Sequence, residues 1–345
     1  MTKHFQLLPE WAEQASVLMA WPHASTDWQP WLEAIEQDYV ALAAAIAQEV
    51  PPLILCQDQA HQDHIHTLLA GRCPHAPRLV IQPYNDTWCR DYGPLTLHGQ
   101  PGLRLLDFRF NGWGDKYEAA LDDGINEQLQ SLWQPPLHRV DFELEGGSIE
   151  TDGQGTLLTT EHCLLGSNRN TDKDRQQIEA LVLEQLGLER TLWLSEGALI
   201  GDDTDSHIDN LARFADPETL VYARCADESD PHHAPLCAME AQLKTFTQAD
   251  GRPYRLVPID LPSPQWDEAG KRLPGSYINF LILNQSVIVP VFNCPQDQAA
   301  ISTLHRCFPG KTILGVPGNN LIKQYGGPHC ATMQLPKGVL QEVLR

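Results

Sequence analysis

The stretch Ser16-Val17-Leu18-Met19-Ala20-Trp21, the segment 31–46 and the run Pro52-Leu53-Ile54-Leu55-Cys56 together decide the fold class. The first and last are short apolar runs bounded by turn residues, which predict buried strands. The segment between them predicts a helix. A strand, a helix and a second strand in this order are typical of an α/β fold.

The same alternation continues along the chain. Further strands are predicted at 78–81, 155–159, 219–223 and 286–290, and further helices at 172–186 and 298–307. About five strand–helix groups follow one another at intervals of roughly 60–70 residues, which is compatible with a repeated unit. No tract of Pro, Gly or Ser is long enough to form a linker. We therefore expect a single domain over residues 1–345.

Composition and charge narrow the class of protein. Hydrophobic residues make up 42% of the 345 residues, and the formal net charge is −21. This charge argues against a nucleic-acid or anionic-membrane partner, which would require basic patches. It suits a small cationic substrate, although an acidic surface that only maintains solubility explains it equally well. No apolar window approaches eighteen residues and the first residues show no signal-like apolar core, so we expect a cytoplasmic protein.

Nine cysteines are present without any CxxC pair, which argues against a zinc site or a redox dithiol. Most are therefore expected to be buried, reduced thiols. Cys330 differs because it follows the turn Gly326-Gly327-Pro328-His329 and precedes the predicted strand 331–335. Such a turn is expected to expose Cys330 and to let its pKa fall, which favours the nucleophilic thiolate.

The densest motif is Asn85-Asp86-Thr87-Trp88-Cys89-Arg90-Asp91-Tyr92-Gly93-Pro94, which follows the predicted strand 78–81. Asp91 could accept two N–H bonds from a guanidinium while Trp88 stacks on its face. The alternative is a turn in which Asp91 pairs with Arg90 or caps the backbone. Spacing alone favours this alternative.

A second motif runs from Asp202 to Asn210. His207 and Asp209 lie two positions apart, so an extended segment would point both side chains to one face. There His207 could move protons while Asp209 holds a guanidinium. The acidic run lacks the glycine and glutamate of a calcium-binding loop, and no metal is expected.

The third motif is Glu145-Gly146-Gly147-Ser148-Ile149-Glu150, after the alternating run 137–144. The glycine pair lets backbone or ligand approach closely. Glu145 could orient His207 and raise its basicity. A solvated glutamate at a turn is the alternative, and it is favoured unless the other motifs are considered.

Taken together, these motifs resemble the agmatine deiminase and bacterial-type peptidylarginine deiminase family of the guanidine-modifying (pentein) superfamily. The resemblance covers essentially the whole chain, in ordered fragments at 20–23, 85–94, 110–117, 145–149, 159–165, 207–210, 276–280 and 329–330. It implies a five-bladed pseudosymmetric α/β propeller with a central active site and no metal or organic cofactor.

The resemblance also implies residue roles. Cys330 would be the nucleophile, His207 the general acid and base, Asp91 and Asp209 the guanidinium clamps, and Glu145 a supporting carboxylate. Four further residues are expected to contact substrate: Trp88, Trp113, Asp203 and Asn279. Two positions depart from the family pattern, which usually has Glu where Asp203 stands and lacks proline where Pro328 stands.

The implied activity is hydrolysis of agmatine, a small cationic guanidine, to N-carbamoylputrescine and ammonia through a covalent Cys330 thiouronium, a step of polyamine biosynthesis. A deiminase of peptidylarginine or another guanidine is the second hypothesis. A non-catalytic binder of guanidino compounds is the third. A homo-oligomer is expected by base rate only.

Overall fold

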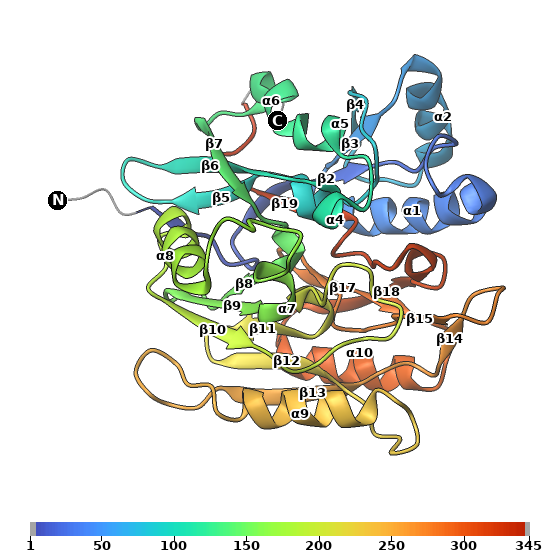
Figure 1. The fold of residues 1–345 in the computed structure, drawn as a ribbon. Coiled ribbons are helices and arrows are strands. Elements are labelled where there is room, and N and C mark those ends of the chain that lie inside the picture. Colours follow the sequence, from blue (N-terminus) through green and yellow to red (C-terminus); the bar gives the residue numbers. More distant parts are fainter. Residues whose placement is uncertain (1–4, 342–345) are drawn as a thin grey trace.

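The computed structural model describes residues 5–341, and the first and last four residues of the predicted 1–345 domain lie outside this range (Figure 1). Strands and helices alternate throughout the described chain. The α/β class expected from the sequence is therefore confirmed.

Five sheets share one pairing pattern, in which an antiparallel pair of strands is extended by a parallel strand. Their orders are β1-β5-β6-β7, β10-β9-β8, β11-β12-β13, β16-β17-β18 and β19-β2-β3-β4. The strands of the first three sheets are β1 (Gln6–Leu7), β5 (Leu95–His98), β6 (Leu103–Arg109), β7 (Leu137–Glu143), β8 (Ile149–Thr151), β9 (Thr156–Thr160), β10 (Arg190–Leu194), β11 (Ala212–Asp216), β12 (Thr219–Arg224) and β13 (Arg255–Asp260). The other two sheets contain β16 (Leu281–Ile282), β17 (Ser286–Val291), β18 (Thr312–Pro317), β19 (Thr332–Pro336), β2 (Gln14–Ala20), β3 (Pro52–Cys56) and β4 (Arg78–Ile81). None of these sheets closes on itself within residues 5–341.

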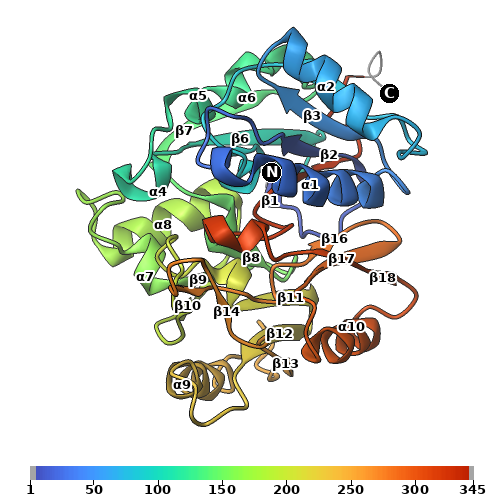
Figure 2. The ribbon, with the colours of Figure 1, turned by 90° about the vertical axis from the view of Figure 1, so that its right-hand side faces the viewer.

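A separate two-stranded ladder, β14 (Gln265–Trp266) with β15 (Arg272–Leu273), projects at one side. The long helices pack on the outer sides of the sheets, where α2, α9 and α10 are seen in both views (Figures 1 and 2). These helices are α1 (Leu32–Ile46), α2 (Gln59–Leu69), α8 (Arg175–Leu186), α9 (His233–Leu243) and α10 (Gln296–Cys307). Of the helices in the described residues, none has both the length and the apolar character needed to cross a bilayer.

The predicted elements agree closely with the observed ones. Strands β3 and β4 have the predicted bounds, and β2 ends at Ala20, one residue early. Helix α8 begins at Arg175 instead of 172, because the Asp174 carboxylate accepts the Gln177 N–H and the Gln177 side chain accepts the Asp174 N–H. This capping box fixes the start of the helix.

Two clusters of buried apolar side chains form the interior. One lies around β2, β3, α1 and the β5–β7 strands, and the other around β12, β17, α9 and α10. The strand that follows Cys330, β19, pairs antiparallel with β2, with Thr332 opposite Met19. This pairing joins segments from the two ends of the described chain and fixes Cys330 next to α3 (Cys89–Tyr92), where the Arg90 N–H donates to the Cys330 carbonyl over 3.1 Å.

Candidate active site

A cavity of about 290 Å³ opens between five segments of the chain, at 27–31, 86–91, 113–117, 203–204 and 323–330. Five of the residues predicted for the site line it, namely Trp88, Asp91, Trp113, Asp203 and Cys330. Its other lining residues are Asp27, Pro30, Trp31, Asp86, Thr204, Tyr117, Lys323, Gln324, Tyr325 and Gly326. The remaining predicted residues, Glu145, His207, Asp209 and Asn279, are buried behind this lining.

Cys330 is buried, with 4% of its surface exposed, so the prediction that its turn exposes it is wrong. The Asn279 amide donates to its sulfur over 3.0 Å, and the thiol donates to Asp209 Oδ2 over 3.3 Å. Burial, Asp209 and Asp91 raise the pKa of Cys330 well above its ordinary value, which corrects the expected fall. A cationic ligand between the two carboxylates would offset part of this effect.

Asp91 lies in α3 and does not pair with Arg90, so that part of the alternative is wrong, whereas it does accept a backbone N–H. Its Oδ1 accepts the Gly147 N–H and its Oδ2 accepts the Trp113 indole N–H, each over 2.8 Å. Burial raises the pKa of Asp91 to about 6, in spite of the opposing effect of His207. The carboxylate is therefore held in place and is costly to ionise without a cation.

His207 precedes a short 3-10 helix, η4 (Ile208–Asn210), so the predicted extended segment is wrong. The ring still faces the site, with Nδ1 3.7 Å from Asp91 Oδ1. It is fully buried, and neither ring nitrogen has a hydrogen-bond partner among the described residues. Burial disfavours its charge, but Asp91, Cys163 and Glu145 outweigh burial and raise the pKa of His207 to about 10.

The close approach around this imidazole requires glycine at position 147. A Cβ there would lie 2.7 Å from His207 Nδ1 and 2.8 Å from Asp91 Oδ1. The expected role of the glycine pair, close approach, is thus confirmed at Gly147.

Asp209 lies in η4, and its two carboxylate oxygens have different partners. Oδ2 contacts His329 Nδ1 over 2.8 Å as well as the Cys330 thiol, and Oδ1 accepts from the Asn210 amide over 3.1 Å. Burial would raise the pKa of Asp209, but the contact with His329 outweighs it and lowers the pKa. Asp209 therefore stays ionised beside the sulfur.

Glu145 is buried, so the solvated-turn alternative is wrong. Its Oε1 accepts from Arg169 Nε over 2.6 Å, and the Cys163 thiol lies 3.8 Å from Oε2. It affects His207 through its charge, and no hydrogen bond joins the two in the described structure. Glu145, Cys163 and His207 could offer a cation three ligand atoms, which lie within 4.8 Å of one another, but Arg169 already occupies one Glu145 oxygen.

The mouth of the cavity is formed by strained loops. Trp113 and Tyr325 have φ angles of 58° and 70°, values that cost energy for side chains of this size. The Asp203 carboxylate accepts from the Tyr117 hydroxyl over 2.6 Å and lies 3.6 Å from Lys116 Nζ. Asp203 is therefore at the cavity, as predicted, but already has two partners.

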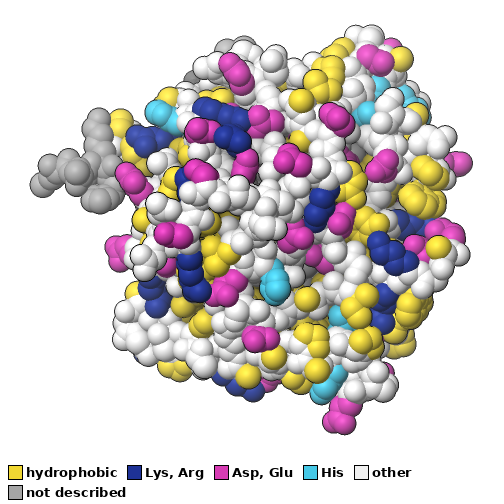
Figure 3. All heavy atoms as spheres, in the orientation of Figure 1, with side chains coloured by type: hydrophobic (Ala, Val, Ile, Leu, Met, Phe, Trp, Pro, Cys, Tyr) yellow, Lys and Arg dark blue, Asp and Glu magenta, His cyan; other side chains and the backbone are white. Residues whose placement is uncertain are grey.

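Several lining and supporting residues were not predicted. Asp86 and Cys163 lie inside quoted motifs, whereas Arg169 and Lys323 carry no signal in the sequence that could have singled them out. On the face seen in Figure 3, acidic and basic side chains are interspersed.

Comparison with known proteins finds relatives over nearly the whole chain. A model of the family described as Porphyromonas-type peptidyl-arginine deiminase matches residues 6–336. The agmatine deiminase of Ectopseudomonas mendocina is 32% identical, over 96% of this chain and 95% of that protein. A solved structure provisionally named a peptidyl-arginine deiminase has a TM-score of 0.93, with 39% identity over 98% of this chain and 100% of its own. A substrate-bound cysteine-to-serine variant of the C. jejuni agmatine deiminase has a TM-score of 0.91, with 34% identity over 98% of each chain.

Proposed function

Because the chain belongs to the Porphyromonas-type peptidyl-arginine deiminase family, we propose that it hydrolyses agmatine to N-carbamoylputrescine and ammonia. The chain is a hydrolase acting on guanidino C–N bonds. One observation carries the assignment to this site: Cys330 and Asp91 line the same cavity, and Asp209 and the unpartnered imidazole of His207 lie directly behind them. A nucleophile, a proton carrier and two anions are what attack on a guanidinium requires.

In the proposed mechanism, Asp91 and Asp209 hold the planar guanidinium, the Cys330 thiol releases its proton to solvent as this cation binds, and the sulfur then attacks the central carbon. The cation between the two carboxylates stabilises the thiolate that they otherwise disfavour. His207, with a pKa near 10, is protonated at neutral pH and donates a proton to the departing nitrogen, so that ammonia leaves.

The second half of the reaction breaks the bond made in the first. The S-alkylthiouronium left on Cys330 is attacked by a water, one of whose protons His207 accepts. The proton of the new hydroxyl group then passes to the sulfur as the C–S bond breaks, which releases the ureido product and the thiol. Glu145, fixed by Arg169, supports the charged form of His207 in both halves.

The size and charge of the cavity support a short dication. Four lining residues are acidic, Asp27, Asp86, Asp91 and Asp203, and within residues 5–341 Lys323 is the one basic residue in the lining. About 290 Å³ suits a small molecule. Trp88 is proposed to contact the substrate from the lining, and Asn279 acts by holding the sulfur.

Deimination of a peptidylarginine is the second candidate. The family description and the provisionally named structural neighbour favour it, as does Lys323, whose ammonium lies over the Trp31 ring at the cavity and pairs with Glu268. A peptide carboxylate could compete for this cation.

The repeated strand pairing also supports two proposals on architecture. We propose that the five sheets are the five blades of a pseudosymmetric propeller, and that they form one catalytic domain. The three-strand unit that all five sheets share, an antiparallel pair followed by a parallel strand, supports both. A cytoplasmic location and independence from metals remain predictions.

The decisive experiment is mass spectrometry of the purified protein incubated with agmatine, free arginine or a peptide containing arginine. We expect a ureido product and ammonia from agmatine. Cys330→Ser should abolish conversion, whereas Cys89→Ser should retain it, since the Cys89 thiol donates only to the backbone carbonyls of Leu18 and Ala331. Conversion of the peptide alone would replace agmatine by peptidylarginine, and full activity of Cys330→Ser would refute the mechanism.

A further inference from the structure

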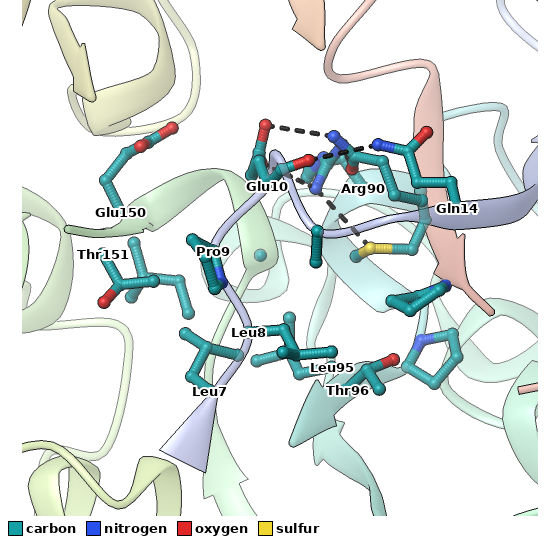
Figure 4. Close-up of a pocket in the computed structure, with 17 residues that line it drawn as sticks. Leu7, Leu8, Pro9, Glu10, Gln14, Arg90, Leu95, Thr96, Glu150 and Thr151 are labelled. Carbon is teal, nitrogen blue, oxygen red and sulfur yellow. Dashed lines mark hydrogen bonds and ion pairs between the residues drawn. The ribbon is translucent and has the colours of Figure 1, made fainter. Parts of the chain in front are cut away.

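Behind the proposed site lies a second, small cavity of about 60 Å³ that shares no lining residue with the first. Glu10, from the loop between β1 and β2, lies at one end of it, with Arg90 and Gln14 on one side of Glu10 and Glu150 on the other (Figure 4). Its carboxylate contacts four side chains, Arg90, Arg213, His329 and Gln334. Four side-chain partners are more than the carboxylate of Glu10 would need if it only stabilised its own turn.

His329 connects this carboxylate to the proposed site. Its Nε2 lies 2.6 Å from Glu10 Oε1, and its Nδ1 lies 2.8 Å from Asp209 Oδ2. Burial opposes ionisation of Glu10, but Arg213, His329 and Arg90 outweigh it and lower the pKa of Glu10. The pKa of Asp209 is lowered as well. Both carboxylates are therefore ionised, and only an imidazole protonated on both nitrogens can donate to each of them.

The second proton on His329 depends on Glu10. Burial and the charges of Arg213 and Arg90 lower the pKa of His329 below its ordinary value, although Glu10 and Asp209 act against them. The ground for a doubly protonated ring is therefore geometric, because both ring nitrogens lie within hydrogen-bond distance of a carboxylate oxygen. Without Glu10 the fully buried ring would face two guanidinium groups. It would then lose the proton on Nε2.

Asp209 carries this effect to the sulfur. The same oxygen, Oδ2, contacts His329 Nδ1 and the Cys330 thiol. A cation on this oxygen reduces the repulsion between Asp209 and a Cys330 thiolate, and it fixes the plane of the carboxylate. A neutral His329 would do neither.

We propose that Glu10 is a positioning residue for the deimination, which keeps His329 protonated and thereby holds Asp209 in the orientation that permits Cys330 to ionise. This inference rests on the proposed role of Cys330 as nucleophile. A metal is a poor alternative occupant of the cluster of Glu10, Glu150 and His329, because Arg213 pairs with both glutamates.

Alkylation of Cys330 by iodoacetamide as a function of pH tests the proposal on the full-length protein without substrate. Mass spectrometry of the Cys330 peptide separates this thiol from the other eight. We expect Glu10→Gln and His329→Gln each to move the alkylation midpoint to higher pH by about one unit. The double variant should show no further shift, since Glu10 acts through His329.

Glu150→Gln is the matched control. It removes a buried carboxylate from Arg213, whose Nε lies 2.5 Å from Glu150 Oε1. It leaves the hydrogen bonds of His329 unchanged. Its midpoint should stay at the wild-type value. Glu10→Asp provides a second variant where Glu10→Gln does not fold, because it keeps a charge opposite the arginines but is one methylene too short for His329; it should show the same upward shift.

The opposite sign would overturn the proposal. If Glu10 acted only as a buried negative charge at a distance, its removal would move the midpoint to lower pH. An unchanged midpoint, or additive shifts in the double variant, would also refute it. Because alkylation needs no substrate, the result is independent of whether agmatine is turned over, which is measured separately on the same preparations.

Discussion

Replacing Asp91 by Asn should reduce turnover. The same substitution should destabilise the protein at acid pH and stabilise it at neutral pH. Burial raises the pKa of Asp91 from 3.8 to about 6. Because the pKa of Asp91 is higher in the folded state than in the unfolded state, ionisation of this carboxylate destabilises the folded protein at pH values above the unfolded-state pKa. By linkage, this cost is about 1 kcal/mol near pH 4.5 and about 3 kcal/mol near pH 7.5.

Asn removes that cost but loses one of two hydrogen bonds. Trp113 and Gly147 both donate to Asp91, and an amide can accept only one of them, which leaves a buried donor unpaired at a cost of about 2 kcal/mol. The net expectation is a loss of about 1 kcal/mol near pH 4.5 and a gain of about 1 kcal/mol near pH 7.5.

Thermal unfolding of wild-type protein and Asp91→Asn at the two pH values measures the reversal. For a chain of this length a change of about 2 kcal/mol corresponds to a difference of about 3 °C in the Tm shift. Trp113→Phe, which removes one donor and keeps the carboxylate, is the control and should show no reversal. An Asp91→Asn variant destabilised equally at both pH values would show that Asp91 is not held at a raised pKa.

Two further predictions concern the same cavity. Asp203→Asn should raise the KM for agmatine by about two- to fivefold and leave kcat unchanged in steady-state assays. The effect is small because this partly exposed carboxylate already has Tyr117 and Lys116 as partners. A tenfold fall of kcat would contradict a role limited to the cavity mouth. In Asp91→Asn the alkylation midpoint of Cys330 should move to lower pH, opposite to Glu10→Gln, because a carboxylate that raises the pKa of Cys330 is lost; an upward shift would show that Asp91 does not act on the thiol through its charge.

The sequence predicted those features whose cause is local. The bounds of β3 and β4 follow from compact apolar runs, and Asp91, His207, Asp209 and Cys330 were identified because each lies in a distinctive motif. The structure brings these four together.

The incorrect predictions concern properties that depend on distant partners. Cys330 was expected to be exposed because its turn is glycine-rich, but Asp209, 121 residues away, and Asn279, 51 residues away, enclose it. The backbone at His207 is set by Thr204, whose hydroxyl accepts the His207 N–H over 3.1 Å, so the two-residue spacing did not produce an extended segment. Glu10 lies 319 residues from His329, and no local pattern indicates their contact.

The pairing of β19 with β2 has a consequence for biosynthesis. Thr332 faces Met19, so this ladder can close only after more than 300 further residues have been translated. At about 5–20 residues per second this takes roughly 15–60 s. Cys330 is made only two residues before Thr332, so the segments that carry Asp91, His207 and Asp209 are all translated before the thiol that they surround. The nucleophile is thus the last part of the site to be added, and it is placed only when the two distant strands have met.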